Sequence, residues 1–235
     1  MKIPKKSIKK TSIFLLLQNV LVPGSILKSV PKETAKAMEF LQKLQKDGLV
    51  ELFLIVGQLK EPGSKVLEKS SFARAFSEKN IFFVTQDYIN SKEPFDKERH
   101  LASLEKDPGF IDEFFKQKVI LDLIEKGRVK RESSVLIAHD MWLDGFYTSR
   151  FSKIDFVLLK ESLSEKNVPV TENIRWLNVI SFTEKDLVNV ILSKLPAPDL
   201  ALLETRIFNR MNRELLSGTD FSGLVKKVSQ AKKGQ

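Results

Sequence analysis

The alternation of short, wholly apolar segments with longer amphipathic ones is the feature that most constrains the fold of this chain. Nearly continuous apolar segments predict strands that are buried on both faces, as in a parallel sheet. They lie at 13–17, 50–57, 80–85, 133–140, 155–161 and 177–182. Because helical segments separate them, the sequence predicts an α/β, Rossmann-like fold with a mainly parallel sheet and helices on both faces.

Helix signals occupy the segments between the predicted strands. A helix is predicted at 31–48, where apolar residues recur at helical spacing and Gly48 takes the C-cap position. Its apolar positions are Ala35, Met38, Leu41 and Leu44. Further helices are predicted at 65–76, at 109–127 with an end at Gly127, and after Thr183, which is suited to be the N-cap.

The chain is expected to contain one α/β domain with additional segments at both ends. Two prolines in the segment 195–199 separate that domain from a C-terminal helical appendage. The predicted parts are a basic tail at 1–10, the α/β domain at 11–195, a helix at 199–217 and a second basic tail at 218–235. Residues 86–110 form either a small cap or a long loop.

The formal net charge of +9 resides at the two ends of the chain. Residues 1–10 hold five lysines and residues 221–235 hold four, with no acidic residue in either segment, so the body between them is balanced. Basic ends are typical of contacts with nucleic acid or another polyanion, and equally of solubilising tails. Both interpretations remain open.

Composition excludes several classes of site. The chain has no cysteine and only two histidines, His100 and His139, so thiolate and histidine-built metal sites are not expected. We expect no cofactor beyond weakly bound magnesium. No apolar run approaches the roughly 18 residues of a membrane span, and we expect a cytoplasmic protein that does not bind membranes.

Four positions at predicted strand ends or on the helix before a strand carry the candidate site. They are Leu16–Asn19, Gly57, Lys116–Lys118 and Asp140–Asp144. Open parallel sheets bind ligands at the carboxyl ends of their strands. In order and spacing these positions resemble the four signature motifs of the haloacid-dehalogenase-like (HAD) hydrolases, a phosphatase superfamily with a Rossmann-like fold. The resemblance extends over about residues 11–195.

The first motif has lost its catalytic residues. The stretch NVLVPG, from Asn19, resembles the residues after the second family aspartate, which places the two aspartates on Leu16 and Gln18. In the family the first is the nucleophile and a magnesium ligand, and the second is the general acid and base. Leucine has no lone pair to attack phosphorus, and a carboxamide does not shuttle protons near neutral pH. Gln18 and Asn19 are therefore interpreted as the remains of a catalytic loop, or as amides that cap the turn.

The second and third motifs are also altered or weak. Gly57 stands where the family has a Ser or Thr that bonds the phosphate, although a glycine amide still donates to an anion. Lys116 and Lys118 are both candidates for the lysine of the third motif, which neutralises the phosphate, and we prefer Lys116. The alternative is that these lysines are ordinary solvated residues of a helix.

The fourth motif is better kept. Asp140 and Asp144 follow an apolar strand at the family's spacing, while Ala138 and His139 depart from its usual glycine. Buried carboxylates are costly unless paired or metal-bound, so a vestigial magnesium site is one explanation. The alternative is that the two aspartates cap the following turn or pair with Arg150 or Lys153. His139 is expected to be structural.

An aromatic cluster follows the fourth motif. Its members are Trp142, Phe146, Tyr147 and Phe151. They are interpreted as packing beneath the loop, with stacking on a base or a sugar as the alternative.

The resemblance and its losses favour a HAD-like pseudoenzyme that acts as a binding or regulatory protein. One alternative is an active phosphatase that uses Asp140 and Asp144 with magnesium. Another is a factor that associates with nucleic acid or ribonucleoprotein through the lysine tails. The helix at 200–216 carries an apolar stripe for a protein partner or for docking on the domain, formed by Leu200, Leu203, Ile207, Met211 and Leu215.

Deletion of residues 1–10 and 221–235 tests where polyanion affinity resides. The truncated protein is expected to keep its melting temperature and to lose most of its retention on an RNA or heparin column, because each lysine–phosphate contact releases counterions. Binding of the full chain to RNA or heparin should weaken steeply as the salt concentration rises. Unchanged retention after truncation would place the binding surface on the domain itself.

Overall fold

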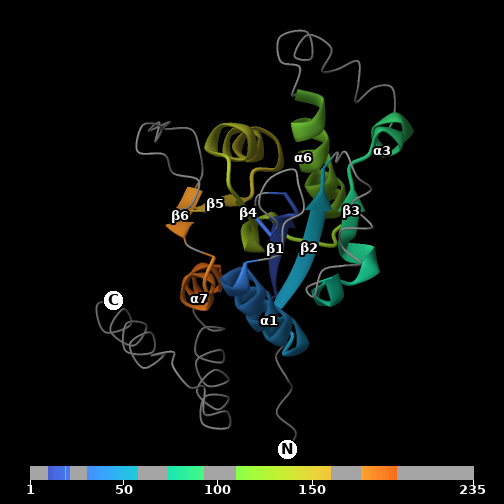
Figure 1. Cartoon of the computed structure of the whole chain (residues 1–235). Coiled ribbons are helices and arrows are strands. Elements are labelled where there is room, and N and C mark those ends of the chain that lie inside the picture. Colours follow the sequence, from blue (N-terminus) through green and yellow to red (C-terminus); the bar gives the residue numbers. More distant parts are fainter. Residues whose placement is uncertain are drawn as a thin grey trace, which may run out of the picture. The chain divides into compact units, whose positions relative to one another are not determined.

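The computed structural model describes residues 10–18, 20–21, 31–57, 73–92, 110–159, 176–180 and 182–194, and a six-stranded sheet lies at their centre. The strands are β1 (Thr11–Leu16), β2 (Val50–Val56), β3 (Ile81–Phe83), β4 (Ser134–Ala138), β5 (Asp155–Leu159) and β6 (Trp176–Ile180). Their order is β3-β2-β1-β4-β5-β6, and each neighbouring pair is parallel (Figure 1). The predicted parallel α/β fold is confirmed.

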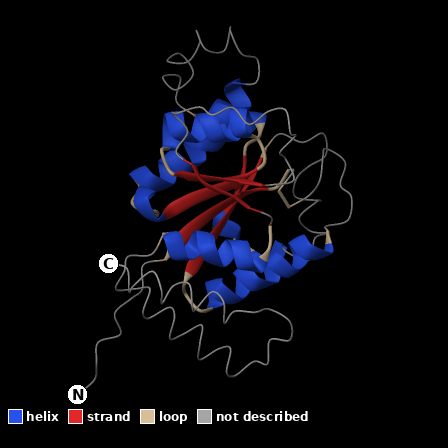
Figure 2. Cartoon of the chain, turned by 90° about the vertical axis from the view of Figure 1, so that its left-hand side faces the viewer, coloured by secondary structure: helices blue, strands red, loops and turns tan. Residues whose placement is uncertain are grey.

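Helices cover both faces of this sheet (Figure 2). Helix α1 (Lys32–Lys46) contacts α7 (Glu184–Ser193), and α6 (Phe110–Glu125) contacts the π-helical turn η5 (Thr148–Ser152). Shorter elements complete the described part. They are η1 (Ala73–Ala75), η2 (Glu78–Asn80), α3 (Gln86–Ser91), η3 (Arg131–Ser133) and the π-helical turn η4 (Met141–Gly145).

The core explains why the strand segments are so apolar. Every residue of β1, β4 and β5 is buried, because helices pack on both sides of the sheet. Phe14 of β1 lies directly opposite Phe53 of β2, and their rings stack with centroids 4.7 Å apart. The neighbouring strands β1 and β2 are thereby joined by side chains as well as by the backbone ladder.

The expected helix ends are confirmed. Gly48 and Gly127 follow α1 and α6 with φ of +74° and +66°, the left-handed region that favours glycine. After α1 the Leu49 amide donates to the Leu44 carbonyl oxygen at 3.0 Å, as in a Schellman motif. At α7 the Thr183 hydroxyl oxygen accepts from the Asp186 amide at 3.4 Å.

Three local features differ from the sequence-based expectation. Ala35 is only half-buried, because it lies at the edge of the apolar face that Thr34 and Ala37 complete. Residues 86–91 form helix α3, a helix that the sequence did not predict within the segment expected to be a small cap or a long loop, and the Thr85 hydroxyl caps it by accepting from the Tyr88 amide at 3.2 Å. The segment after β4 is π-helical over η4 and η5, where a turn was expected.

Several expectations concern residues outside those described. These are both tails, the helix at 199–217 with its apolar stripe, Asn19, most of the helix at 65–76 and the segment 93–109 of the cap or loop. In the described part of the chain, no helix is long and apolar enough to cross a bilayer.

Gly145 is expected to be intolerant of a side chain. A Cβ added there would lie 3.0 Å from Cε1 of Phe156, which is fully buried in β5. Gly145→Ala should therefore lower the free energy of unfolding by about 1–3 kcal/mol, the usual cost of overpacking. Chemical denaturation measures it. If the collision is the cause, the double variant with Phe156→Leu loses less than the sum of the single losses, whereas simple additivity would contradict it.

Candidate functional site

The carboxyl ends of three adjacent strands form the candidate site. β1 lies between β2 and β4, with Leu16 opposite Ile55 and Leu15 opposite Ile137. The strand order reverses between β1 and β4, and such a switch point is where open α/β sheets bind ligands. Gln18, Gly57 and Asp140 follow these three strands at the same edge of the sheet.

Gln18 and Gly57 are in direct contact at this edge. The Gly57 amide donates to Oε1 of Gln18 at 3.1 Å. A Cβ on Gly57 would lie 3.2 Å from Gln18 Nε2 and 3.3 Å from its Oε1, tighter than ordinary van der Waals contact. The side chain of Gln18 therefore covers the backbone of Gly57 and uses its N–H group.

Lys116 of α6 reaches the same point. Its Cε would lie 3.2 Å from a Cβ on Gly57, so the structure brings together the positions expected for the first three motifs. The Lys116 ammonium binds Oε1 of Glu113 at 2.6 Å, and the two side chains are 17% and 10% exposed. Glu113 was not singled out from the sequence. Its only signal is the spacing of three residues between an acid and a lysine on one helix.

Lys118, the other candidate lysine, belongs to a different cluster. It binds Asp122 at 3.1 Å, and Lys92 binds the second oxygen of the same carboxylate. Burial raises the pKa of Asp122, but hydrogen bonds and charge from Lys92 and Lys118 outweigh it and hold that pKa below its ordinary value of 3.8. Lys118 thus has a structural role.

Leu16 occupies the position that the resemblance assigns to the nucleophile. It ends β1 and is 4% exposed, so an alkyl group fills this position. An alkyl side chain neither attacks phosphorus nor binds a cation.

Asp140 and Asp144 bond to the turn that follows β4. Oδ1 of Asp140 accepts from the Leu143 amide at 2.8 Å, and Oδ2 of Asp144 accepts from the Asp140 amide at 3.2 Å. Asp144 is 3% exposed. These bonds support the turn-capping alternative. Arg150 and Lys153 are both exposed, and the Arg150 guanidinium lies over the Phe151 ring, 5.1 Å from its centroid.

His139 lies beside the same carboxylate. Its Nδ1 is 3.7 Å from Oδ2 of Asp144 and is buried without a hydrogen-bond partner among the described residues. The two groups form an ion pair only when the imidazole is protonated. Among the described residues, Nδ1 of His139 thus has no hydrogen bond to a hydroxyl that it could activate.

A buried polar network anchors this segment to α6. Gln117 Nε2 donates to the Thr148 hydroxyl at 3.0 Å, and the Ser152 hydroxyl donates to Gln117 Oε1 at 2.7 Å. The Thr148 hydroxyl in turn donates to the Asp144 carbonyl oxygen. All these side chains are buried, so the network fixes the turn of Asp144 against the helix that carries Lys116.

Aromatic rings pack along the same interface. Phe114 of α6 contacts Phe151 with centroids 5.1 Å apart, and Phe151 contacts Tyr147 at 5.7 Å. Tyr147 also contacts Phe146, which is 42% exposed, whereas nothing is described for the Trp142 side chain. These contacts agree with packing beneath the segment.

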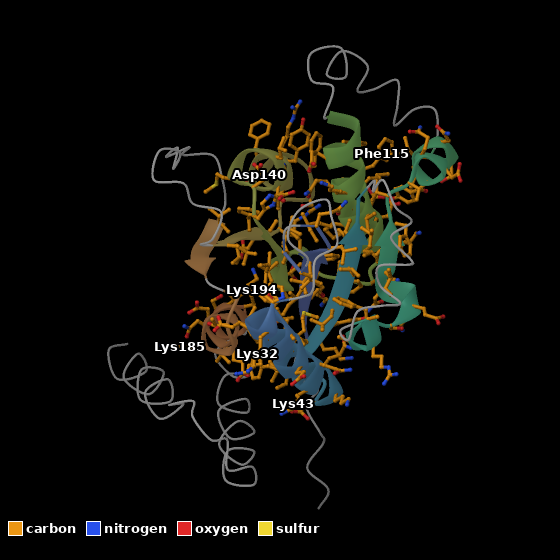
Figure 3. The ribbon with its side chains drawn as sticks, in the orientation of Figure 1. Lys32, Lys43, Phe115, Asp140, Lys185 and Lys194 are labelled. Atoms are coloured by element: carbon orange, nitrogen blue, oxygen red, sulfur yellow. The ribbon has the colours of Figure 1, made fainter. Side chains whose placement is uncertain are left out.

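Figure 3 shows Phe115 and Asp140 on the α6 side of the sheet, opposite Lys32, Lys43, Lys185 and Lys194.

The donor set does not fit a magnesium ion. Mg²⁺ requires near-octahedral oxygen coordination and is held through carboxylates. Here Leu16 takes the place of one carboxylate, and Asp140 and Asp144 each give an oxygen to a backbone amide. Within the described ranges, no three His, Cys, Asp or Glu side chains gather around a common point.

Comparison with known proteins reveals likeness at the level of structure. No protein-family model and no curated protein matches the chain. Similar solved structures include yhjK, a haloacid dehalogenase-like hydrolase protein from Bacillus subtilis, with 12% identity and a TM-score of 0.45 over 80% of this chain and 92% of that chain. Another is NagD from E. coli K-12, with 12% identity and a TM-score of 0.46 over 75% and 98% of the respective chains.

A third similar structure is an uncharacterized protein from Listeria monocytogenes serotype 4b, with 14% identity and a TM-score of 0.46 over 78% of this chain and 98% of that chain. Likeness at this level concerns the fold. The α/β assignment rests on the strand order and parallel register of the chain itself.

The cluster around Asp122 is expected to support folding at neutral pH. Because the folded pKa of Asp122 is lowered, its contribution is present above the ordinary value of 3.8 and is lost as pH falls through the folded pKa. Asp122→Asn should destabilise the protein near pH 7, and its difference from wild type should shrink as pH falls below 3.8. Chemical denaturation from pH 7 down to below pH 3.8 measures the free energy of unfolding of the variant and of the wild type. Asp87→Asn, at an exposed site on α3, is the control. A difference that grows toward acid would contradict the account.

Proposed function

We propose that this chain is a HAD-like protein that has lost phosphoryl transfer and acts by binding, as a regulatory or scaffold protein. One observation carries the proposal. The position of the attacking carboxylate holds Leu16, 4% exposed at the end of the central strand. Phosphoryl transfer in the family begins with attack by that carboxylate, so its replacement removes the covalent step.

The remaining polar groups do not supply a substitute. A water nucleophile needs a general base and an ion to orient it, and these contributions amount to many kcal/mol of the barrier. Asp140 and Asp144 follow β4 at this edge, and each has an oxygen committed to the backbone of the turn. Lys116 is neutralised by Glu113. This arrangement supports retention of the fold without its chemistry.

The sequence suggests where binding takes place. We propose that a protein partner engages the apolar stripe of the helix at 200–216 and that the lysine tails contact nucleic acid or another polyanion in the cytoplasm. Both segments lie outside the described residues, so this part of the proposal rests on residue pattern and charge alone.

A phosphatase assay tests the loss of catalysis. The full chain is expected to hydrolyse p-nitrophenyl phosphate with magnesium no faster than the buffer, and Asp140→Asn should behave identically, because no group at this edge attacks phosphorus. Magnesium-dependent turnover that Asp140→Asn abolishes would establish the phosphatase alternative. Turnover that survives Asp140→Asn would reveal a different catalytic site.

A further inference from the structure

Two hydrogen-bond donors of different origin lie near the carboxyl end of β2. One is the backbone N–H of Gly57, and the other is the ammonium group of Lys116, whose Cε would lie 3.2 Å from a Cβ on Gly57. A backbone amide next to a lysine ammonium is a combination suited to an oxyanion. It lies at the switch point of the sheet, where ligands of such folds bind.

Both donors are already bonded to acceptors that belong to the chain itself. Gln18 Oε1 accepts from the Gly57 amide at 3.1 Å, and Glu113 Oε1 binds the Lys116 ammonium at 2.6 Å. The charged pair is largely removed from solvent, at 17% and 10% exposure, and Gly57 is buried. One amide oxygen and one carboxylate oxygen thus bind the groups that an external anion would use.

We infer that Gln18 and Glu113 are the internal occupants of this oxyanion position and that the chain closes its own ligand site. An anion from solution has to displace a carboxylate that is tethered three residues away on the same helix, where its effective concentration is high. Displacement would also break the ion pair between that buried carboxylate and the Lys116 ammonium, which is costly. The inference rests on the proposed function and explains what fills the site once catalysis is lost.

Gly57 also contributes to the internal occupation of the oxyanion position, because it has no side chain. A Cβ there would meet Gln18 Nε2 and Lys116 Cε, each at 3.2 Å. The hydroxyl-bearing residue that the family resemblance expects at this position would therefore require Gln18 or Lys116 to shift by a few tenths of an ångström. The absence of a side chain at Gly57 leaves room for the inward placement of Gln18.

Binding of inorganic phosphate to the full chain tests the closure. Calorimetry should detect no specific phosphate binding to the wild type and a gain of about tenfold or more in affinity for Glu113→Gln, because phosphate then no longer competes with a carboxylate for the Lys116 ammonium. Glu125→Gln, an exposed site on the same helix, should behave as the wild type. Addition of Lys116→Met to Glu113→Gln should abolish the gain.

Two results would overturn the inference. They are phosphate binding to the wild type as tight as to Glu113→Gln, and a folded Glu113→Gln protein that gains no affinity. Phosphatase turnover by the wild type would instead overturn the proposed function. Since phosphate binding is measured without turnover, the two failures are distinguishable.

A double-mutant cycle covers the case in which Glu113→Gln does not fold. Gly57→Ala should lower the melting temperature in the wild type and lower it less in Gln18→Ala, because the collision with the Gln18 carboxamide is removed. The coupling should be on the order of tenfold in the unfolding equilibrium constant. Equal losses in the two backgrounds would show that Gln18 does not occupy this position and would overturn the inference.

Discussion

The central place of β1 is the constraint on which the rest of the structure depends. This strand is buried along its whole length and is hydrogen-bonded on one edge to β2 and on the other to β4. Parallel pairing on both edges fixes the direction of the three strands, so the residues that follow them meet at one edge of the sheet. The contact of Gln18 with Gly57 and the nearness of Lys116 are consequences of that pairing.

Helix α6 turns this edge into a closed surface. Three of its polar residues reach different parts of the chain. Lys116 lies at the end of β2, Gln117 bonds Thr148 and Ser152 after β4, and Asp122 binds Lys92 after α3. Buried polar groups destabilise a protein when they lack partners and specify its packing when they have them. The contacts of α6 therefore hold three other segments in one arrangement.

Much of the fold could be predicted from the residues. The continuous apolar runs indicated each of the six strands to within a few residues, and the helix ends at Gly48 and Gly127 followed from the need for a positive φ. Helix α3 was missed because its six residues carry no apolar period, and only Thr85 marked its start. The π-helical turns after β4 were missed because no residue pattern distinguishes them from an ordinary turn.

The candidate site was predicted in its positions but not in its contacts. Lys116 was preferred over Lys118, and the structure brings Lys116 to Gly57 while Lys118 binds Asp122. The Gln18 bond to Gly57 joins residues 39 positions apart, and the Gln117 bond to Ser152 joins residues 35 apart. Pairings of this kind depend on the packing of whole elements and leave no local signal in one sequence.

Hydrogen exchange of the Gly57 amide tests the central claim most directly. If Gln18 permanently occupies this donor, the amide is protected in the wild type and exchanges faster by a factor on the order of tenfold in Gln18→Leu, the gain expected when a single hydrogen bond is lost. The amides of β1 and β4 should keep their rates. Equal exchange of the Gly57 amide in the two proteins would contradict the account, because the donor would then be held by something other than Gln18.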